Sequence, residues 1–195
     1  MPSMGRTAIH HNLDEFLGSL SARQGRSVAV MVSSVDGRAT VGGRVGALTG
    51  DADQKVLLGV RELADAVVVG GRTVRNEGYE ELLDESAQAR RRQRGLPPEP
   101  ELVVFTRASP DPTELWAELR DRHPEGLIVC EGGPTLLGML VERRVLDELV
   151  LGISPLLVGD EHQKRLIEGT GELGLDVELI ATAAEGGFLF LRYGL

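Results

Sequence analysis

Two short apolar runs in this chain each end at a pair of glycines, and this repeated pattern constrains the fold more than any other feature of the sequence. Residues 66–69 (AVVV) are followed by Gly70-Gly71, and residues 127–130 (LIVC) are followed by Glu131-Gly132-Gly133. Apolar runs of this length are typical of strands that are buried on both faces of a parallel sheet. We therefore expect an α/β fold in which each glycine pair lies at the carboxyl end of a strand.

The segment after the second glycine pair has the pattern of a helix. Apolar residues recur there every three to four positions, and Pro134 suits the first helical turn because its missing N–H has no partner at that position. A turn of this kind directs free backbone N–H groups and the positive end of the helix dipole at one point, which suits a phosphate group. The alternative is that the glycines only close a tight connection between strand and helix.

Strand-like and helix-like segments alternate along most of the chain. Strands are expected at residues 28–33, 66–69, 102–105 and 127–130, with one helix beginning near Asp51 and another over residues 112–120. This alternation predicts a parallel sheet that is covered by helices on both faces. From Asp147 onwards, three strand-like segments follow one another with hardly a helix between them. We expect them to extend the same sheet in antiparallel fashion.

The length of 195 residues fits one domain, which we place at residues 27–195. Residues 1–26 are expected to be a polar lead-in segment with one possible short helix over residues 13–20. Residues 78–100 are expected to form a charged excursion, in which the three arginines at residues 90–92 lie in a solvated loop.

The charge and cysteine content argue against several classes of function. A net charge of −9, with only four Phe, two Tyr and one Trp, does not fit a nucleic-acid-binding surface. Cys130 is the single cysteine, so the sequence offers no disulfide and no paired-cysteine metal motif. No run approaches the roughly 18 apolar residues of a membrane helix. We expect a cytoplasmic protein that binds neither a membrane nor a metal.

The two glycine turns together indicate a ligand with several phosphates. Ligands of open α/β sheets lie beyond the carboxyl ends of the parallel strands, so one dinucleotide can contact both turns. Neither turn matches the common G-x-G-x-x-G or P-loop patterns. Arg72 and Arg75 flank Thr73, and a positive pair near a ribose favours the 2′-phosphate of NADPH. The alternative is that both arginines face solvent.

Several stretches resemble the reductase half of the bifunctional riboflavin-biosynthesis deaminase/reductase. The matching stretches, in the order of that family, are MVSSVDGRAT, LTGDADQKVLLGVRELADAVVVGGRTV, EGGPTLLGMLVERRVLDELVL, SPLLVG and GFLFLRY. They span most of residues 28–193. The resemblance implies a three-layer, dihydrofolate-reductase-like fold, whose central sheet is mixed and mostly parallel with antiparallel C-terminal strands.

The resemblance also implies a set of site residues where the motifs align. Asp36, which belongs to the S-x-D-G motif, contacts the substrate in this interpretation, although a simple Asp-Gly turn explains it equally well. The other residues implied to hold the substrate, a pyrimidine ribosyl-phosphate, are Arg61 and Glu131. Together with the glycine-turn argument, the set implied to hold the cofactor comprises Thr49, Gly70, Gly71, Arg72, Thr73, Glu77, Gly132, Gly133, Pro134, Thr135 and Leu136.

The chain departs from the family pattern at several places. Val45 and Ala47 stand where the family commonly has a polar and an aromatic residue, which puts the usual contacts to the substrate in doubt. The sequence after Thr73 is RNEGY rather than paired aspartates and a proline, and the segment from Phe105 to Glu131 is short. With one cysteine, the chain also lacks the P-C-x-x-C motif of zinc deaminases, so we expect no deaminase half in it.

The sequence thus predicts an NADPH-dependent reductase that acts on a ribosylaminopyrimidine 5′-phosphate in riboflavin biosynthesis. The resemblance further implies a homodimer. Two alternatives stay open: a folate or pterin reductase on the same fold, and a dinucleotide-binding module that has lost its turnover. The sequence identifies no group that donates the proton for the reduction.

Overall fold

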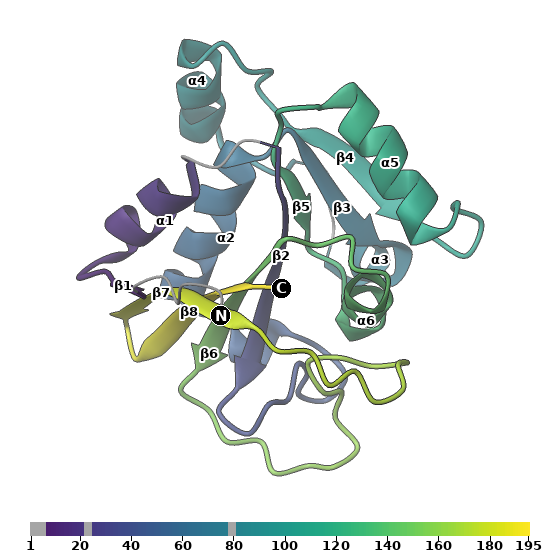
Figure 1. The fold of residues 1–195 in the computed structure, drawn as a ribbon. Coiled ribbons are helices and arrows are strands. Elements are labelled where there is room, and N and C mark those ends of the chain that lie inside the picture. The colour runs from purple at the N-terminus through teal and green to yellow at the C-terminus, as the bar shows by residue number, and fades with distance from the viewer. Residues whose placement is uncertain (1–6, 22–24, 78–80) are drawn as a thin grey trace, which may run out of the picture.

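The computed structural model describes residues 7–21, 25–77 and 81–195, which build one eight-stranded sheet with helices on both faces (Figure 1). The strands are β1 (Ala8–Ile9), β2 (Ser27–Ser34), β3 (Ala66–Gly70), β4 (Glu101–Phe105), β5 (Ile128–Cys130), β6 (Glu148–Ser154), β7 (Glu178–Glu185) and β8 (Phe188–Gly194). Each of the four strands predicted before residue 131 is confirmed to within one residue at either end.

The sheet has the order β1-β7-β8-β6-β2-β5-β3-β4, and it is mixed. The pairs from β6 through β2, β5 and β3 to β4 are all parallel, whereas β8 is antiparallel to both β6 and β7. The expected mostly parallel sheet with antiparallel C-terminal strands is confirmed. The parallel strands β2, β3 and β5 end at the same side of the sheet, where the two glycine turns follow β3 and β5.

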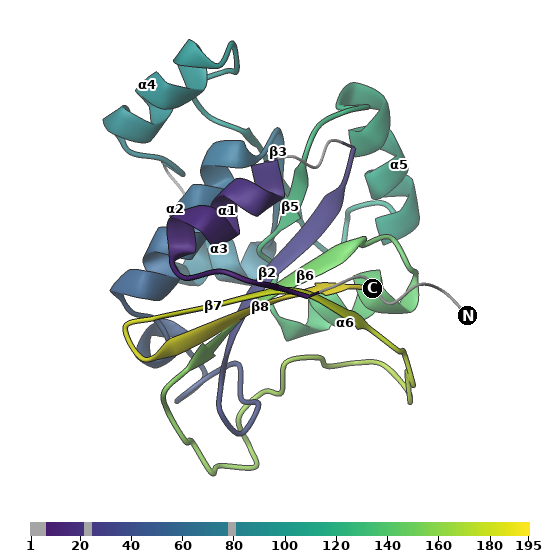
Figure 2. The same ribbon diagram turned by 60° about the vertical axis from the view of Figure 1, so that its left-hand side comes forward.

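The helices are α1 (Leu13–Ser21), α2 (Asp51–Leu63), α3 (Gly71–Glu77), α4 (Glu85–Gln93), α5 (Pro112–Arg122) and α6 (Pro134–Glu142), with a 3₁₀ turn η1 (Gly46–Leu48) before α2. Helices α1 and α2 cover one face of the sheet, and α5 and α6 cover the other, as both ribbon views show (Figure 2). Each face therefore has its own apolar core, and the molecule has three layers.

Helix α1 belongs to the apolar core on the same face of the sheet as α2. The side chains of Leu13 and Phe16 are fully buried, and the ring of Phe16 lies 6.5 Å from that of Phe190 on β8. The helix predicted over residues 13–20 is thus present, and it packs in the same core cluster as α2 and the strands. The division of the chain at residue 26 stays a prediction, but α1 does not stand apart from the domain.

The prediction of a solvated loop around the three arginines at residues 90–92 was wrong. All three arginines lie in α4, and the side chain of Arg91 is fully buried. Its Nη1 donates hydrogen bonds to the carbonyl oxygens of Glu62 (2.9 Å) and Ala64 (2.6 Å) at the end of α2, and its Nε donates to that of Pro97 (2.8 Å). Arg91 therefore satisfies carbonyl groups that the last turn of a helix leaves free.

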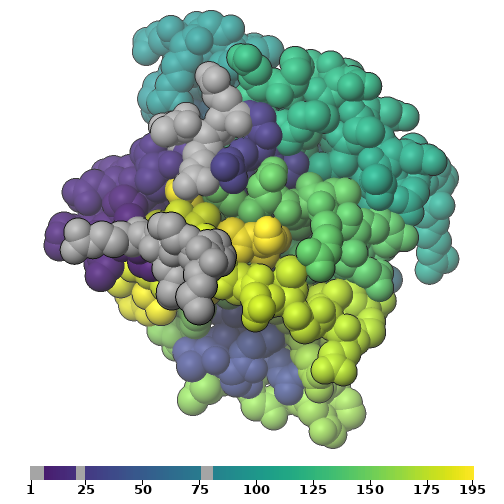
Figure 3. Space-filling model, in the orientation of Figure 1, coloured from purple at the N-terminus to yellow at the C-terminus, as the bar shows by residue number. Residues whose placement is uncertain are grey.

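Two loops that are far apart in the sequence are joined beside the carboxyl ends of the strands. The carboxylate of Asp36 accepts hydrogen bonds from the backbone N–H groups of Val158 (3.0 Å) and Gly159 (2.8 Å), and the hydroxyl of Thr40 accepts one from the N–H of Lys164 (3.1 Å). On the surface, residues near 40 (dark blue) border the light green residues that follow β6 (Figure 3). We name the pair, residues 35–45 and 155–168, the paired loops.

Candidate active site

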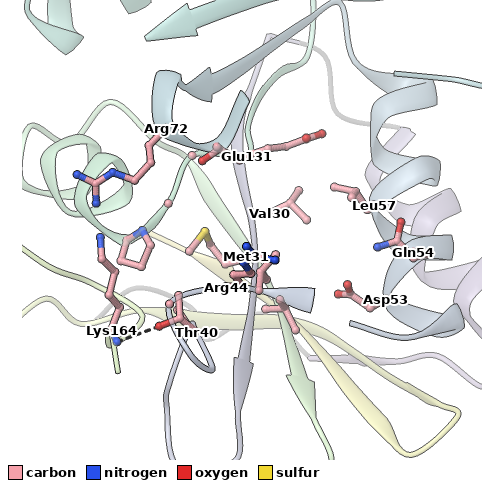
Figure 4. Close-up of a pocket in the computed structure, with 18 of the residues that line it drawn as sticks. Val30, Met31, Thr40, Arg44, Asp53, Gln54, Leu57, Arg72, Glu131 and Lys164 are labelled. Atoms are coloured by element: carbon pink, nitrogen blue, oxygen red, sulfur yellow. Dashed lines mark hydrogen bonds between the residues drawn. The ribbon is translucent and has the colours of Figure 1, made fainter. Parts of the chain in front are cut away.

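A pocket of about 390 Å³ lies beyond the carboxyl ends of β3 and β5, and we name it the inner pocket. Strand β2 contributes Val30 and Met31 to its floor (Figure 4). Asp53, Gln54 and Leu57 line it from α2 on one side, and Arg72 and Lys164 line it from the opposite side. The pocket is thus formed by the sheet, one helix, the glycine turns and the paired loops.

A second pocket of about 810 Å³ adjoins the first, and we name it the outer pocket. It lies between the turn after β3, the turn after β4 and the start of α6. Arg72, Thr73, Gly133 and Lys164 line both pockets, so an extended molecule can occupy the two together. Both glycine turns therefore contribute residues to the outer pocket, and the binding of one ligand to both turns stays a prediction.

The turn between β5 and α6 has a geometry that accepts an anion. Gly133 is the residue before the first turn of α6, and its φ of −69° is accessible to any residue. A Cβ at Gly133 would meet nothing within 4 Å, whereas one at Gly132 would lie 2.4 Å from a side-chain carbon of Leu136. Among the described residues, no acceptor is found for the backbone N–H groups of Gly133, Thr135 and Leu136. Open space next to free N–H groups at a helix N-terminus suits a phosphate.

Arg61 and Glu131, which both line the inner pocket, form a buried ion pair. The Nε and Nη2 atoms of Arg61 donate to the two carboxylate oxygens of Glu131, both at 2.7 Å, and the side chains are 12% and 4% exposed. A paired, planar geometry of this kind is the strongest arrangement for these two groups. Two of the three residues expected to hold the substrate, Arg61 and Glu131, are thus brought together as partners of each other.

Asp36 lies outside the residues that line the two pockets. The hydroxyl of Ser34 donates to its carboxylate at 2.6 Å. This bond, followed by those from the N–H groups of Val158 and Gly159, holds the pKa of the Asp36 carboxyl far below its usual range. The contacts favour the turn interpretation, in which Asp36 joins the paired loops instead of contacting a ligand.

The remaining predicted cofactor residues separate into three groups. Thr49 lies outside both pockets, and its hydroxyl donates to the carbonyl of Gly46 at 2.9 Å. Glu77 ends α3, and its side chain lies outside the described part of the structure. The others line one pocket or both: Gly70, Gly71, Arg72, Thr73, Gly132, Gly133, Pro134, Thr135 and Leu136.

Sequence reasoning missed three charged residues of the inner pocket, namely Arg44, Asp53 and Lys164. Within the described part of the chain, the side chains of Arg44, Arg72 and Lys164 have no ion-pair partner. Burial raises the pKa of the Asp53 carboxyl to about 6. A sequence signal existed only for Asp53, which follows the T-G motif by three residues at the start of an amphipathic helix.

The chemistry of the remaining candidate groups is limited. Cys130 ends β5, and burial raises the pKa of its thiol to about 12, so it is not a ready nucleophile. His123-Pro124-Glu125 has the letters of the H-x-E deaminase motif, but Nε2 of His123 lies 2.7 Å from a carboxylate oxygen of Glu101. Among the described residues, no group of three or more His, Cys, Asp or Glu side chains is arranged to hold a metal ion.

The model of the RibD C-terminal domain family matches residues 26–114 and 87–186 of the chain. The chain belongs to this family. The resemblance identified in the sequence is therefore confirmed for the reductase domain. A search of curated protein sequences gives no significant match.

Solved structures of this family and of dihydrofolate reductase share the fold. A pyrimidine reductase-like protein from Corynebacterium diphtheriae aligns with a TM-score of 0.76 and 18% identity, over 89% of this chain and 93% of the other. RibD from Acinetobacter baumannii aligns with a TM-score of 0.64 and 16% identity, over 93% of this chain but only 61% of RibD. Dihydrofolate reductase from Enterococcus faecalis, complexed with NADP(H), aligns with a TM-score of 0.60 and 17% identity, over 88% of this chain and 97% of the other.

These alignments confirm the expected dihydrofolate-reductase-like fold for this member of the RibD C-terminal domain family. Because the chain spans about three fifths of the A. baumannii RibD, the activity of that whole protein is not transferred to it. Within the described residues, no helix has the length and apolar character needed to cross a membrane.

Proposed function

We propose that the protein is an NADPH-dependent reductase of an open-chain ribosylaminopyrimidine 5′-phosphate, of the type that acts in riboflavin biosynthesis. The observation that carries this proposal is the joining of two pockets at one edge of the sheet. One pocket borders an anion-binding helix N-terminus, and the other contains a buried carboxylate held by an arginine. Membership of the RibD C-terminal domain family and the likeness to a pyrimidine reductase-like protein support it.

The outer pocket suits the dinucleotide. The free N–H groups of Gly133, Thr135 and Leu136 would hold its pyrophosphate, and the open space at Gly133 lets the phosphates approach the backbone. Arg72 and Arg75 both line this pocket and would pair with the 2′-phosphate that distinguishes NADPH from NADH. The bound cofactor supplies a hydride, while the protein orients the two ligands and excludes water.

The inner pocket suits the substrate. A carboxylate oxygen can accept more than one hydrogen bond, so Glu131 can accept one from an N–H of the pyrimidine while Arg61 holds it. Arg61 fixes the direction of this carboxylate. Arg44 and Lys164, which have no ion-pair partner among the described residues, would balance the charge of the substrate phosphate.

Purified protein tests the proposal directly. NADPH oxidation is followed at fixed cofactor concentration with a ribosylaminopyrimidine phosphate, with dihydrofolate, and with neither. Oxidation that depends on the aminopyrimidine supports the proposal. The likeness to dihydrofolate reductase makes a folate or pterin reductase the second candidate, and oxidation with dihydrofolate alone would establish it. Val45, which stands where the family commonly has a polar residue, lines the inner pocket. Binding of NADPH without turnover of either substrate would favour the third candidate, a dinucleotide-binding module.

The homodimer, the cytoplasmic location and the domain boundary at residue 27 also belong to this proposal. Strands β6 and β8 have apolar sequences that would suit a dimer contact, but they are interior strands of the sheet, so they could meet a second copy only through a face. Leu189 on β8 is 41% exposed and lies on such a face. Light scattering that finds a stable 21.0 kDa monomer would exclude the dimer.

A further inference from the structure

Asp53 is an acidic side chain with no partner at the edge of the inner pocket. It is the third residue of α2, and its carboxylate faces the pocket from the side opposite Arg72 and Lys164 (Figure 4). Within the described residues, its carboxylate makes no hydrogen bond and no ion pair. A half-buried polar group without a partner is costly for stability, which suggests a use in function.

The surroundings of Asp53 explain why the pKa of its carboxyl is raised. A Cβ placed on Gly152 of β6 would lie 3.2 Å from Oδ1 of Asp53 and 3.3 Å from the ring of Phe190, so the carboxyl lies against an apolar part of the sheet. Loss of hydration is the cause that raises its pKa to about 6. The other charged groups that line the pocket are Arg44, Arg61, Arg72, Glu131 and Lys164.

The other side chains of the inner pocket are poorer proton donors. Glu131 accepts from Arg61 with both oxygens and acts as an acceptor there. Arginine does not release its proton in proteins. No described histidine, tyrosine or cysteine lines the pocket, and the hydroxyls of Thr40 and Thr73 are far weaker acids than a carboxyl group, so the ammonium of Lys164 is the remaining competitor.

We propose that Asp53 protonates the substrate nitrogen during the reduction, and this inference rests on the proposed function. Reduction of the open-chain imine forms a C–H bond at C1′ with the hydride that NADPH supplies. The π electrons of the C=N bond move to the nitrogen, which takes the proton of the Asp53 carboxyl. Asp53 is left as a carboxylate and regains a proton from water at the mouth of the pocket. The imine becomes an amine, and NADPH becomes NADP⁺.

The test compares Asp53→Asn with Asp51→Asn, which removes an exposed carboxylate from the same helical turn. The turnover of the wild type should fall as the pH rises through the pKa of Asp53. Asp53→Asn should lower kcat about a hundredfold or more, with KM changed little, and should abolish this pH dependence. Asp51→Asn should match the wild type. In the free protein, a carboxyl-carbon NMR titration should show one aspartate with a pKa of about 6 that is missing in Asp53→Asn.

The outcomes separate this inference from the proposed function. A wild type that turns over the aminopyrimidine, together with an Asp53→Asn variant of equal kcat and equal pH profile, overturns the role of Asp53 alone. A raised KM with unchanged kcat also overturns it, since Asp53 would then only bind substrate. A normal pKa of Asp53 in the NMR titration of the wild type overturns it without any variant. No turnover by the wild type overturns the proposed function and this inference with it. Loss of the pH dependence in Lys164→Met, but not in Asp53→Asn, assigns the proton to Lys164.

Discussion

The guanidinium of Arg61 donates two hydrogen bonds to the carboxylate of Glu131, each 2.7 Å long, although the residues are 70 positions apart in the sequence. Arg61 comes from the third turn of α2, and Glu131 follows β5 directly. Because both side chains are nearly buried, the pair joins a helix to the sheet and at the same time presents a fixed carboxylate to the inner pocket. Under the proposed function, stability and substrate recognition would thus depend on the same two residues.

Glu131→Gln is expected to lower both turnover and stability while leaving NADPH affinity within a few fold. The amide keeps one acceptor but removes the buried negative charge that faces Arg61, which should lower the free energy of unfolding by about 2–4 kcal/mol. Urea unfolding, steady-state kinetics and calorimetric titration with NADPH measure the three effects. A large loss of NADPH affinity with unchanged substrate kinetics would reverse the assignment of Glu131.

The double variant Arg61→Met with Glu131→Met separates the two roles of the pair. Replacing both members of a buried ion pair by apolar residues is often neutral for stability, so the double variant should recover most of the stability that Glu131→Gln loses. Its turnover should stay low, because the carboxylate that is proposed to bind the pyrimidine is removed. Recovery of turnover together with stability would mean that Glu131 has only a structural role.

NADPH is expected to bind about tenfold or more tightly than NADH, because Arg72 and Arg75 can pair with the additional phosphate. The double variant Arg72→Ala with Arg75→Ala should reduce this preference mainly by weakening NADPH binding. Arg92→Ala, which removes an exposed arginine of α4 that lines neither pocket, serves as the control and should keep the preference. Equal dissociation constants of the wild type for the two cofactors would contradict the assignment.

Asp53→Asn is expected to stabilise the protein at neutral and alkaline pH. Since burial raises the pKa of Asp53 from 3.8 to about 6, the folded state binds this proton more tightly than the unfolded state does. The stability that the wild type has below about pH 4 is therefore partly lost as the pH rises through 6, and the variant escapes this loss. Allowing for partial exposure, we expect a gain of about 1–2 kcal/mol at pH 8 and none at pH 4 in urea unfolding. An equal gain at both pH values would show that the carboxylate charge is not its cause.

Arg91→Ala and Arg92→Ala compare two neighbouring arginines in opposite surroundings. Arg91 is fully buried and donates to the carbonyl oxygens of Glu62, Ala64 and Pro97, whereas Arg92 is exposed. Arg91→Ala leaves these carbonyl groups without donors and opens a cavity, so it should cost about 3 kcal/mol or more in urea unfolding. Arg92→Ala should change stability by about 0.5 kcal/mol at most. A small effect of Arg91→Ala would mean that water replaces its hydrogen bonds.

The sequence predicted the features that depend on local pattern. The buried strands and the glycine turns follow from runs of neighbouring residues, and the free N–H groups at the start of α6 follow from the turn itself. The burial of Arg91 could not be predicted in this way, because its partners lie about thirty residues away and a run of arginines is usually solvated. Lys164 reaches the pocket only because its loop is bound to Thr40, a contact that no local signal announces. The burial of Asp53 depends on β6 and β8, which lie far from it in the sequence, so its sequence position indicates only an ordinary acidic residue in a first helical turn.

Gly133→Asp tests whether the turn before α6 binds a phosphate group of NADPH. The backbone of Gly133 has a φ of −69° and a Cβ there meets no atom within 4 Å, so the substitution causes neither strain nor a clash. A carboxylate next to a helix N-terminus is favourable by about 0.3–1 kcal/mol, which should leave the thermal midpoint of the free protein nearly unchanged or slightly raised. The same carboxylate would occupy the space of the pyrophosphate and repel it. We therefore expect a folded variant whose thermal midpoint no longer rises when NADPH is added.

Gly171→Asp provides the matched control for this prediction. Gly171 also has open space around its Cβ position and no positive φ, but it lies away from a helix N-terminus and lines neither pocket. The control adds the same negative charge to the chain, so it should retain the shift in thermal midpoint that NADPH causes in the wild type. If Gly133→Asp also retained the full shift, the glycines would only close a connection between strand and helix. If both variants lost it, the added charge would act through the net charge of the protein rather than at the turn.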